Sequence, residues 1–174
     1  IAGGTNPPSN YATLNELWDG SSWTETTELN TANALQRAIS GATQTAVIVS
    51  GGNVPPYSSN TETWNGSAWT EVSELNSAKY SHAASGPSAA ALVFGGEIST
   101  GIIAQTESWD GSAWTEVNDL ATSRKDLGSG GASPNTVSIA FGGKNPTSTF
   151  KTETEEWTFS GLPPSTPAAG YSDA

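Results

Sequence analysis

The feature that most constrains this chain is an eight-residue motif that occurs three times. The copies read WDGSSWTE, WNGSAWTE and WDGSAWTE; they begin at Trp18, Trp64 and Trp109 and lie 46 and 45 residues apart. A shortened fourth copy, WTFSG, begins at Trp157. A fixed period of about 20 to 50 residues is typical of proteins built from stacked copies of one small unit. The sequence therefore predicts an array of equivalent units.

Three further features repeat in register with these tryptophans. A Gly-Gly pair ends an apolar run, a Glu lies two residues before the first Trp of the motif, and a Leu closes the first three units. The glycines are Gly3, Gly4, Gly51, Gly52, Gly95, Gly96, Gly142 and Gly143; the others are Glu16, Glu62, Glu107 and Glu155, and Leu29, Leu75 and Leu120.

Each unit is predicted to form four short strands. Small residues make the first strand, as in ISGA, AASG and GSGGAS, and the apolar run before Gly-Gly makes the second. The third strand ends in Glu-x-Trp, and the fourth begins at the second Trp of the motif, which is Trp23, Trp69 or Trp114. Between the two Trp, DGS or NGS supplies residues that tolerate positive φ in a tight hairpin. The two Trp should therefore face each other across that turn.

This pattern predicts an all-β fold, a β-propeller with about four four-stranded antiparallel blades. The small first strand suits the innermost position, where blades converge, and an apolar second strand is typical of a strand covered on both faces. The units span about residues 1–29, 30–75, 76–120 and 121–160, and residues 161–174, rich in Pro, Ser and Ala, are expected to be an exit linker.

The sequence does not decide whether these four blades form a complete ring. Propellers usually have about four to eight blades. Either these four close a small ring, or chain outside this segment or a second copy completes a larger one. The opening residues, IAGG, have the composition of a strand end, so we expect further chain to contribute.

The order Gly-Gly, Glu-x-Trp, turn, Trp and closing Leu resembles the kelch repeat over nearly the whole chain to about Trp157. Kelch repeats usually have Tyr where this chain has the first Trp of each motif. They also usually have an Arg soon after the closing Leu, and at that position this chain has Asn33, Lys79 and Arg124. The version E-x-W-[DN]-G-S-x-W-T-E is similar to kelch-like arrays of tailed phages, especially marine ones. That resemblance implies a virion or tail-fibre protein.

The charge and composition exclude several classes of function. A net charge of −11 repels nucleic-acid backbones and anionic membrane surfaces, so we expect no nucleic acid as a partner. No apolar run is long enough to span a membrane, so membrane insertion is not expected. The chain contains no Cys, which removes disulfides, thiolate metal sites and a cysteine nucleophile.

The repeated residues are interpreted as structural. A packing residue must recur in every blade, whereas a ligand-binding residue need not, so the Trp columns are expected to pack between blades and across hairpins. The aligned Glu side chains are expected to accept hydrogen bonds from backbone N–H groups, and no metal site or other cofactor is predicted. His82, the only His, has no partner in a recognisable catalytic motif, so no catalytic residue is predicted.

The variable loops before the third strands are the predicted binding surface. They read TNPPSN, NVPP, EISTG and KNPTST, and in a propeller they emerge on one face of a rigid scaffold. An aromatic or Ile side chain follows each loop, seven residues before the first Trp, and this shared offset favours packing; these are Tyr11, Tyr57, Ile102 and Phe150. The candidate ligand-binding residues are Asn6, Asn53, Glu97, Lys144 and Asn145.

These observations favour a non-enzymatic, structural and adhesive module of a phage virion, in a tail fibre or attached to the capsid. It would bind a host-surface glycan or a neighbouring virion protein and lie on the virion or another extracellular surface. Two alternatives stay open: a spacer without a ligand, and a carbohydrate-active enzyme on a propeller scaffold.

Overall fold

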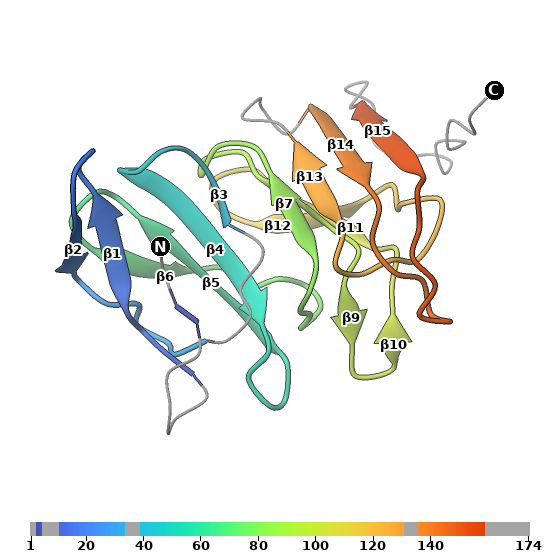
Figure 1. Cartoon of the computed structure of the whole chain (residues 1–174), viewed down its shortest axis with the longest axis horizontal. Helices are drawn as coiled ribbons and strands as arrows, with labels where there is room; N and C mark the ends of the chain where they lie inside the picture. The colour runs from blue at the N-terminus through green and yellow to red at the C-terminus, as the bar shows by residue number, and fades with distance from the viewer. Residues whose placement is uncertain (1–2, 5–10, 34–38, 131–135, 159–174) are drawn as a thin grey trace.

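The computed structural model describes residues 3–4, 11–33, 39–130 and 136–158. This part of the chain is all-β and contains no helix. It has five antiparallel sheets; the four main ones, leaving aside the small pair β9–β10, follow one another along the chain, as Figure 1 shows from β1 and β2 at one end to β13, β14 and β15 at the other. The predicted all-β fold is therefore confirmed, whereas a closed propeller ring stays a prediction. The predicted linker, residues 161–174, lies outside the described residues.

The four main sheets have two, four, four and three strands. The first contains β1 (Asn15–Trp18) and β2 (Trp23–Thr26). The second contains β3 (Ile39–Thr43), β4 (Ala46–Gly52), β5 (Ser58–Trp64) and β6 (Trp69–Val72). The third contains β7 (Ala83–Ser85), β8 (Leu92–Phe94), β11 (Thr106–Trp109) and β12 (Trp114–Val117). The fourth contains β13 (Gly128–Gly130), β14 (Val137–Phe141) and β15 (Thr154–Thr158).

Each sheet is a meander in which sequential strands pair. A fifth sheet, which the sequence did not predict, is a short hairpin of β9 (Glu97–Ile98) and β10 (Gly101–Ile102) in the connection between β8 and β11. The small first strands of successive sheets lie close together, β3 beside β7 and β7 beside β13. The Ser85 and Ser138 hydroxyls, 2.7 Å apart, connect the third and fourth sheets. The small residues of β7 and β13 allow these two strands to lie close together.

The repeated motif forms the predicted hairpin. Trp64 pairs with Trp69 across the turn, and their ring centroids are 5.3 Å apart. In the turn, the Asn65 side-chain oxygen accepts hydrogen bonds from the backbone N–H groups of Ser67 and Ala68. Gly66 has φ +98°, which other residues rarely adopt. The other two copies have the same pairing and the same centroid distance, so the motif is a self-contained turn unit.

The Trp columns pack between sheets only where an earlier sheet covers them. Trp64 and Trp69 contact the first sheet, and Trp109 and Trp114 contact the second; all four are at most 7 % exposed. The half-buried Trp157 packs against the third sheet in the same way. Trp18 and Trp23 pack on each other across their hairpin but not between sheets; they are 43 % and 50 % exposed, because no described part of the chain covers that face of the first sheet.

The aligned Glu residues join each sheet to the connection that enters it. Glu62 accepts hydrogen bonds from the backbone N–H groups of Asn30 and Thr31, at 2.9 and 3.0 Å. Glu107 accepts one from Asn76 N–H at 2.7 Å. In the fourth sheet Glu155 accepts one from Ala121 N–H, also at 2.7 Å. The prediction that these carboxylates bind neighbouring backbone is therefore confirmed for these three residues.

The Gly-Gly pairs let each sheet approach the connection that leaves it. Gly52 N–H donates to the Lys79 carbonyl at 2.9 Å, and Gly96 N–H donates to the Arg124 carbonyl at 2.8 Å. Gly51 has φ +65°, and a Cβ there would lie 2.5 Å from the Lys79 carbonyl oxygen. Only glycine satisfies both the conformation and the space at this position.

Candidate functional site

Successive sheets present their variable loops on one edge of the molecule. The β4–β5 connection, the β9–β10 hairpin and the β14–β15 connection all emerge along the lower edge of Figure 1. We call this surface the loop edge; it consists of residues 53–57, 97–102 and 144–150, together with Tyr80 and Lys125, which contact them. The prediction that the loops share one edge is therefore confirmed for three of the four loops; the first, residues 5–10, lies outside the described residues.

Side chains at the centre of the loop edge form one contact network across three sheets. The rings of Tyr57 and Tyr80 are 4.5 Å apart between centroids. The Tyr80 hydroxyl donates a 2.7 Å hydrogen bond to Glu97 Oε2, and Lys125 Nζ forms an ion pair with the same oxygen. The Lys125 ammonium group also lies 5.7 Å from the Tyr80 ring centroid. One tyrosine, one carboxylate and one ammonium group thus hold each other in fixed positions.

The network continues into the fourth sheet through the backbone. Lys125 and Lys144 exchange two backbone hydrogen bonds of 2.9 and 2.8 Å. The Lys144 ammonium group lies over the ring of Phe150, 5.1 Å from its centroid. Phe150 is 76 % exposed, so the prediction that it packs at the blade rim is wrong. An exposed aromatic ring beside an ammonium group is instead available to a partner.

The electrostatics keep this network in one protonation state. Burial alone would raise the pKa of Glu97, but the hydrogen bonds from Lys125 and Tyr80 outweigh it and hold that pKa below its ordinary value. Burial and the bond to Glu97 raise the pKa of Tyr80. At neutral pH the carboxylate is therefore charged and the phenol is protonated.

The other predicted ligand-binding residues have different surroundings. Asn53 is half-buried in the β4–β5 connection. The Asn145 side-chain oxygen accepts hydrogen bonds from the backbone N–H groups of Thr147 and Thr149, so it shapes its own loop. Asn6 lies outside the described residues. Glu97 and Lys144 are the two predicted residues that belong to the network.

Sequence reasoning missed Tyr80 and Lys125 as site residues. Both directly follow the position after the closing Leu where kelch repeats have Arg, occupied here by Lys79 and Arg124. That shared position is the signal that could have identified them. The loops alone did not show it, because these two residues lie on the connections between sheets.

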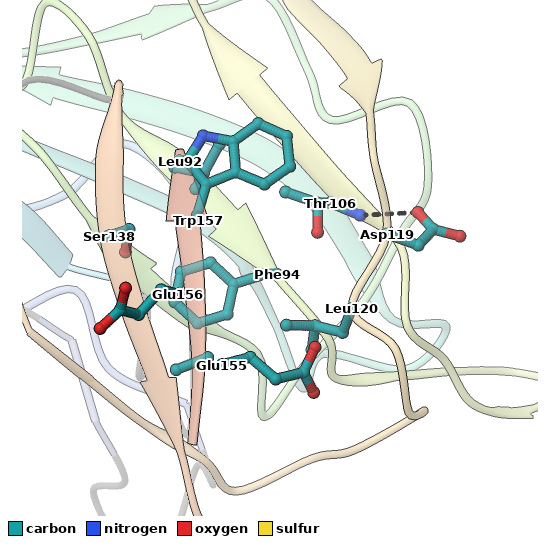
Figure 2. Close-up of a pocket in the computed structure, with 10 residues that line it drawn as sticks. Leu92, Phe94, Thr106, Asp119, Leu120, Ser138, Glu155, Glu156 and Trp157 are labelled. Carbon is teal, nitrogen blue, oxygen red and sulfur yellow. Dashed lines mark hydrogen bonds between the residues drawn. The ribbon is translucent and has the colours of Figure 1, made fainter. Parts of the chain in front are cut away.

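A cavity of about 40 Å³ between the third and fourth sheets is a weaker candidate (Figure 2). Leu92, Phe94 and Leu120 form its apolar wall beside Trp157, and Thr106 and Asp119 lie at one end. Ligand sites are typically about 300–1,000 Å³, and a cavity of this size holds only a few waters.

Two of the acidic groups around this cavity already have partners. Asp119 accepts a hydrogen bond from Thr106 N–H, and Glu155 binds the connection between the two sheets. The cavity lies on the third sheet at the position where Trp114 packs on the second sheet. There the Trp114 indole N–H donates a hydrogen bond to Thr61. The fourth copy of the motif lacks this second Trp, so we interpret the cavity as a packing gap.

His82 does not provide a reaction site. It is 2 % exposed, and its ring lies against Gly51. Burial and the charge of Lys79 lower its pKa from 6.5 to about 3. A substrate at the surface cannot reach this imidazole.

Two further features are absent from the described ranges of the chain. Within them, no three His, Asp or Glu side chains gather closely enough to hold a metal ion. These ranges also contain no helix with the length and apolarity needed to cross a membrane. Comparison of the sequence with protein-family models and with curated proteins found no match.

Proposed function

We propose that this chain is a kelch-type β-propeller segment that acts as a non-enzymatic adhesive module of a phage virion, in a tail fibre or attached to the capsid. In this proposal the loop edge binds a glycan on the host surface. The observation that carries it is the exposed Phe150 ring beside Lys144, on an edge built from the loops that vary between units.

The chemistry of the loop edge suits a sugar ligand. An aromatic face packs against the C–H groups of a pyranose ring, and the neighbouring polar groups fix the orientation of its hydroxyls. Glu97 and Lys125 are held by Tyr80, so they lose little side-chain entropy on binding. In a chain of net charge −11, Lys125 and Lys144 also provide a local attraction for sugars that carry a carboxylate.

A glycan array with neutral and carboxylate-bearing sugars tests this function. We expect the intact chain to bind at least one class, and Phe150→Ala and Lys144→Ala each to weaken binding about tenfold, which corresponds to about 1.4 kcal/mol. Glu116→Ala, on the exposed side of β12, is the matched control and should bind like the parent chain.

Two results would contradict the proposal. Binding to no glycan and to no intact host cell would favour the spacer. Release of reducing sugar from a polysaccharide would favour the enzyme.

A further inference from the structure

The open face of the first sheet carries a preformed pair of indole rings. The centroids of Trp18 and Trp23 are 5.3 Å apart, with an angle of 47° between the rings. The buried pairs have the same centroid distance, with angles of 41° and 43°. Leu14, 38 % exposed, adds to the exposed apolar surface of this sheet. The first sheet thus holds the Trp pair in the geometry of a buried pair without burying it.

The interior of the chain shows what covers such a pair. Trp109 and Trp114 are buried in one cluster with Ile48 and Leu75 of the preceding sheet and its connection. The Trp114 indole N–H donates a 3.1 Å hydrogen bond to the Thr61 hydroxyl. The covering surface is therefore an aliphatic second strand beside a Thr on the third strand.

The far face of the fourth sheet presents a surface of the same kind. On β14, Ser138 and Ala140 are buried, whereas Val137 and Phe141 on the other face are 48 % and 46 % exposed. A shallow hollow of about 400 Å³ lies over this region, lined in part by Val137 and Ile139.

The register matches the two surfaces at two positions. Ile139 pairs with Glu156, one residue after the repeated Glu, as Ile48 pairs with Thr63. Thr154 directly precedes that repeated Glu, as Thr61 does in the second sheet. The fourth sheet therefore offers the aliphatic residue and the hydroxyl that accommodate a Trp pair inside the chain.

We propose that the Trp18–Trp23 face of one chain docks on the β14 face of a second copy, head to tail. The contact repeats the sheet-to-sheet packing that occurs three times within the chain. It is heterologous, because different faces of the two copies meet, so it generates a closed ring or an open filament.

Sedimentation velocity over a concentration series tests this proposal. We expect the intact chain to form dimers and larger species as concentration rises. Each copy carries a net charge of −11, so association should strengthen when salt rises from about 0.05 to about 0.5 M and screens the repulsion. Phe150→Ser, on the loop edge, is the control and should associate like the parent chain. A parent chain that stays monomeric at every concentration and salt overturns the proposal.

Complementation between variants tests the head-to-tail arrangement. The double variant Trp18→Ser, Trp23→Ser lacks the indole pair that would dock, and Phe141→Ser reduces the apolar surface of the β14 face. Each variant alone should therefore be mainly monomeric. Circular dichroism checks that both retain their β structure. Mixed together, the two variants should form dimers and nothing larger, because one intact interface remains. Self-association of the Phe141→Ser variant as strong as that of the parent chain would show that the β14 face is not the partner surface and would overturn the arrangement.

Discussion

Lys79 Nζ and Glu107 Oε1 form a 2.7 Å ion pair between side chains that are 0 % and 1 % exposed. Lys79 lies on the connection that leaves the second sheet, and Glu107 lies on β11 of the third. The same carboxylate accepts hydrogen bonds from the backbone and side chain of Asn76 on that connection. One buried carboxylate therefore fixes the path of the chain between two sheets.

Breaking this pair should destabilise the protein strongly. Lys79→Met leaves a buried carboxylate without its counter-charge, which typically costs about 3–5 kcal/mol. Replacing both partners, as Lys79→Met with Glu107→Gln, removes the buried charge while the Gln amide oxygen can still accept from Asn76 N–H, so this double change should cost less than the single one. Urea unfolding measures both. The control is Lys151→Met, because Lys151 and Glu153 are 23 % and 47 % exposed and such pairs contribute about 0–1 kcal/mol. Equal effects of the two lysine substitutions would contradict the prediction.

The second sheet offers a related prediction without a charge pair. Glu62→Ala leaves the part-buried N–H groups of Asn30 and Thr31 without their acceptor; a fully buried unpaired donor costs about 1–3 kcal/mol, so we expect a loss near the lower end of that range. Glu71→Ala on the exposed side of β6 is the matched control and should change stability by less than about 0.5 kcal/mol. The free energy of unfolding from urea titration tests the difference.

Sequence reasoning predicted the features that each unit repeats. The hairpin between Trp64 and Trp69 depends only on its own turn residues, so local chemistry was sufficient. The role of Glu62 was also accessible, because a carboxylate that recurs in every unit must perform a task common to all units. Repetition identifies packing and backbone contacts well for this reason.

The candidate site was predictable only in part. Glu97 and Lys144 were identified because they lie on variable loops, but their partners Tyr80 and Lys125 lie on connections far away in sequence. Such a network depends on how sheets stack in space, which periodicity does not reveal. The exposure of Trp18 has the same origin, since a repeated residue is buried only where a neighbouring sheet lies against it.

The Trp columns give a prediction that compares one substitution at two positions. Trp109 is 1 % exposed, so Trp109→Ala should destabilise the protein by about 3–5 kcal/mol. Trp18→Ala should cost much less in a monomer, because that ring is already 43 % exposed. Thermal unfolding of dilute samples compares the two variants. Similar losses of stability at both positions would contradict the packing between sheets.

His82 predicts how stability depends on pH. Its pKa falls from 6.5 to about 3 on folding, so between these values the unfolded chain binds a proton that the folded chain does not. This contribution to the free energy of unfolding is complete above pH 6.5 and is lost as the pH falls toward 3. The slope from this one group approaches about 1.4 kcal/mol per pH unit. Urea unfolding at about pH 7, 6 and 5, where most carboxylates stay ionised, measures it. His82→Gln should be flatter over this range, and an equal slope would contradict the assignment.

Gly95 and Gly142 test the contact between a sheet and its outgoing connection, because they occupy the same repeat position with φ of +66° and +65°. A Cβ at Gly95 would lie 2.5 Å from the Arg124 carbonyl oxygen, whereas at Gly142 the nearest atom, the Lys151 carbonyl oxygen, is 3.6 Å away. Both Ala variants pay about the same conformational cost, of order 1 kcal/mol, so the difference between them measures the clash. We expect Gly95→Ala to be less stable than Gly142→Ala by about 1–3 kcal/mol, since the backbone at residue 95 and at Arg124 must move apart. Urea unfolding of the two variants gives this difference directly. Equal stabilities would mean that the connection after the third sheet moves freely, and the close approach at Gly95 would then have no role in holding the sheets together.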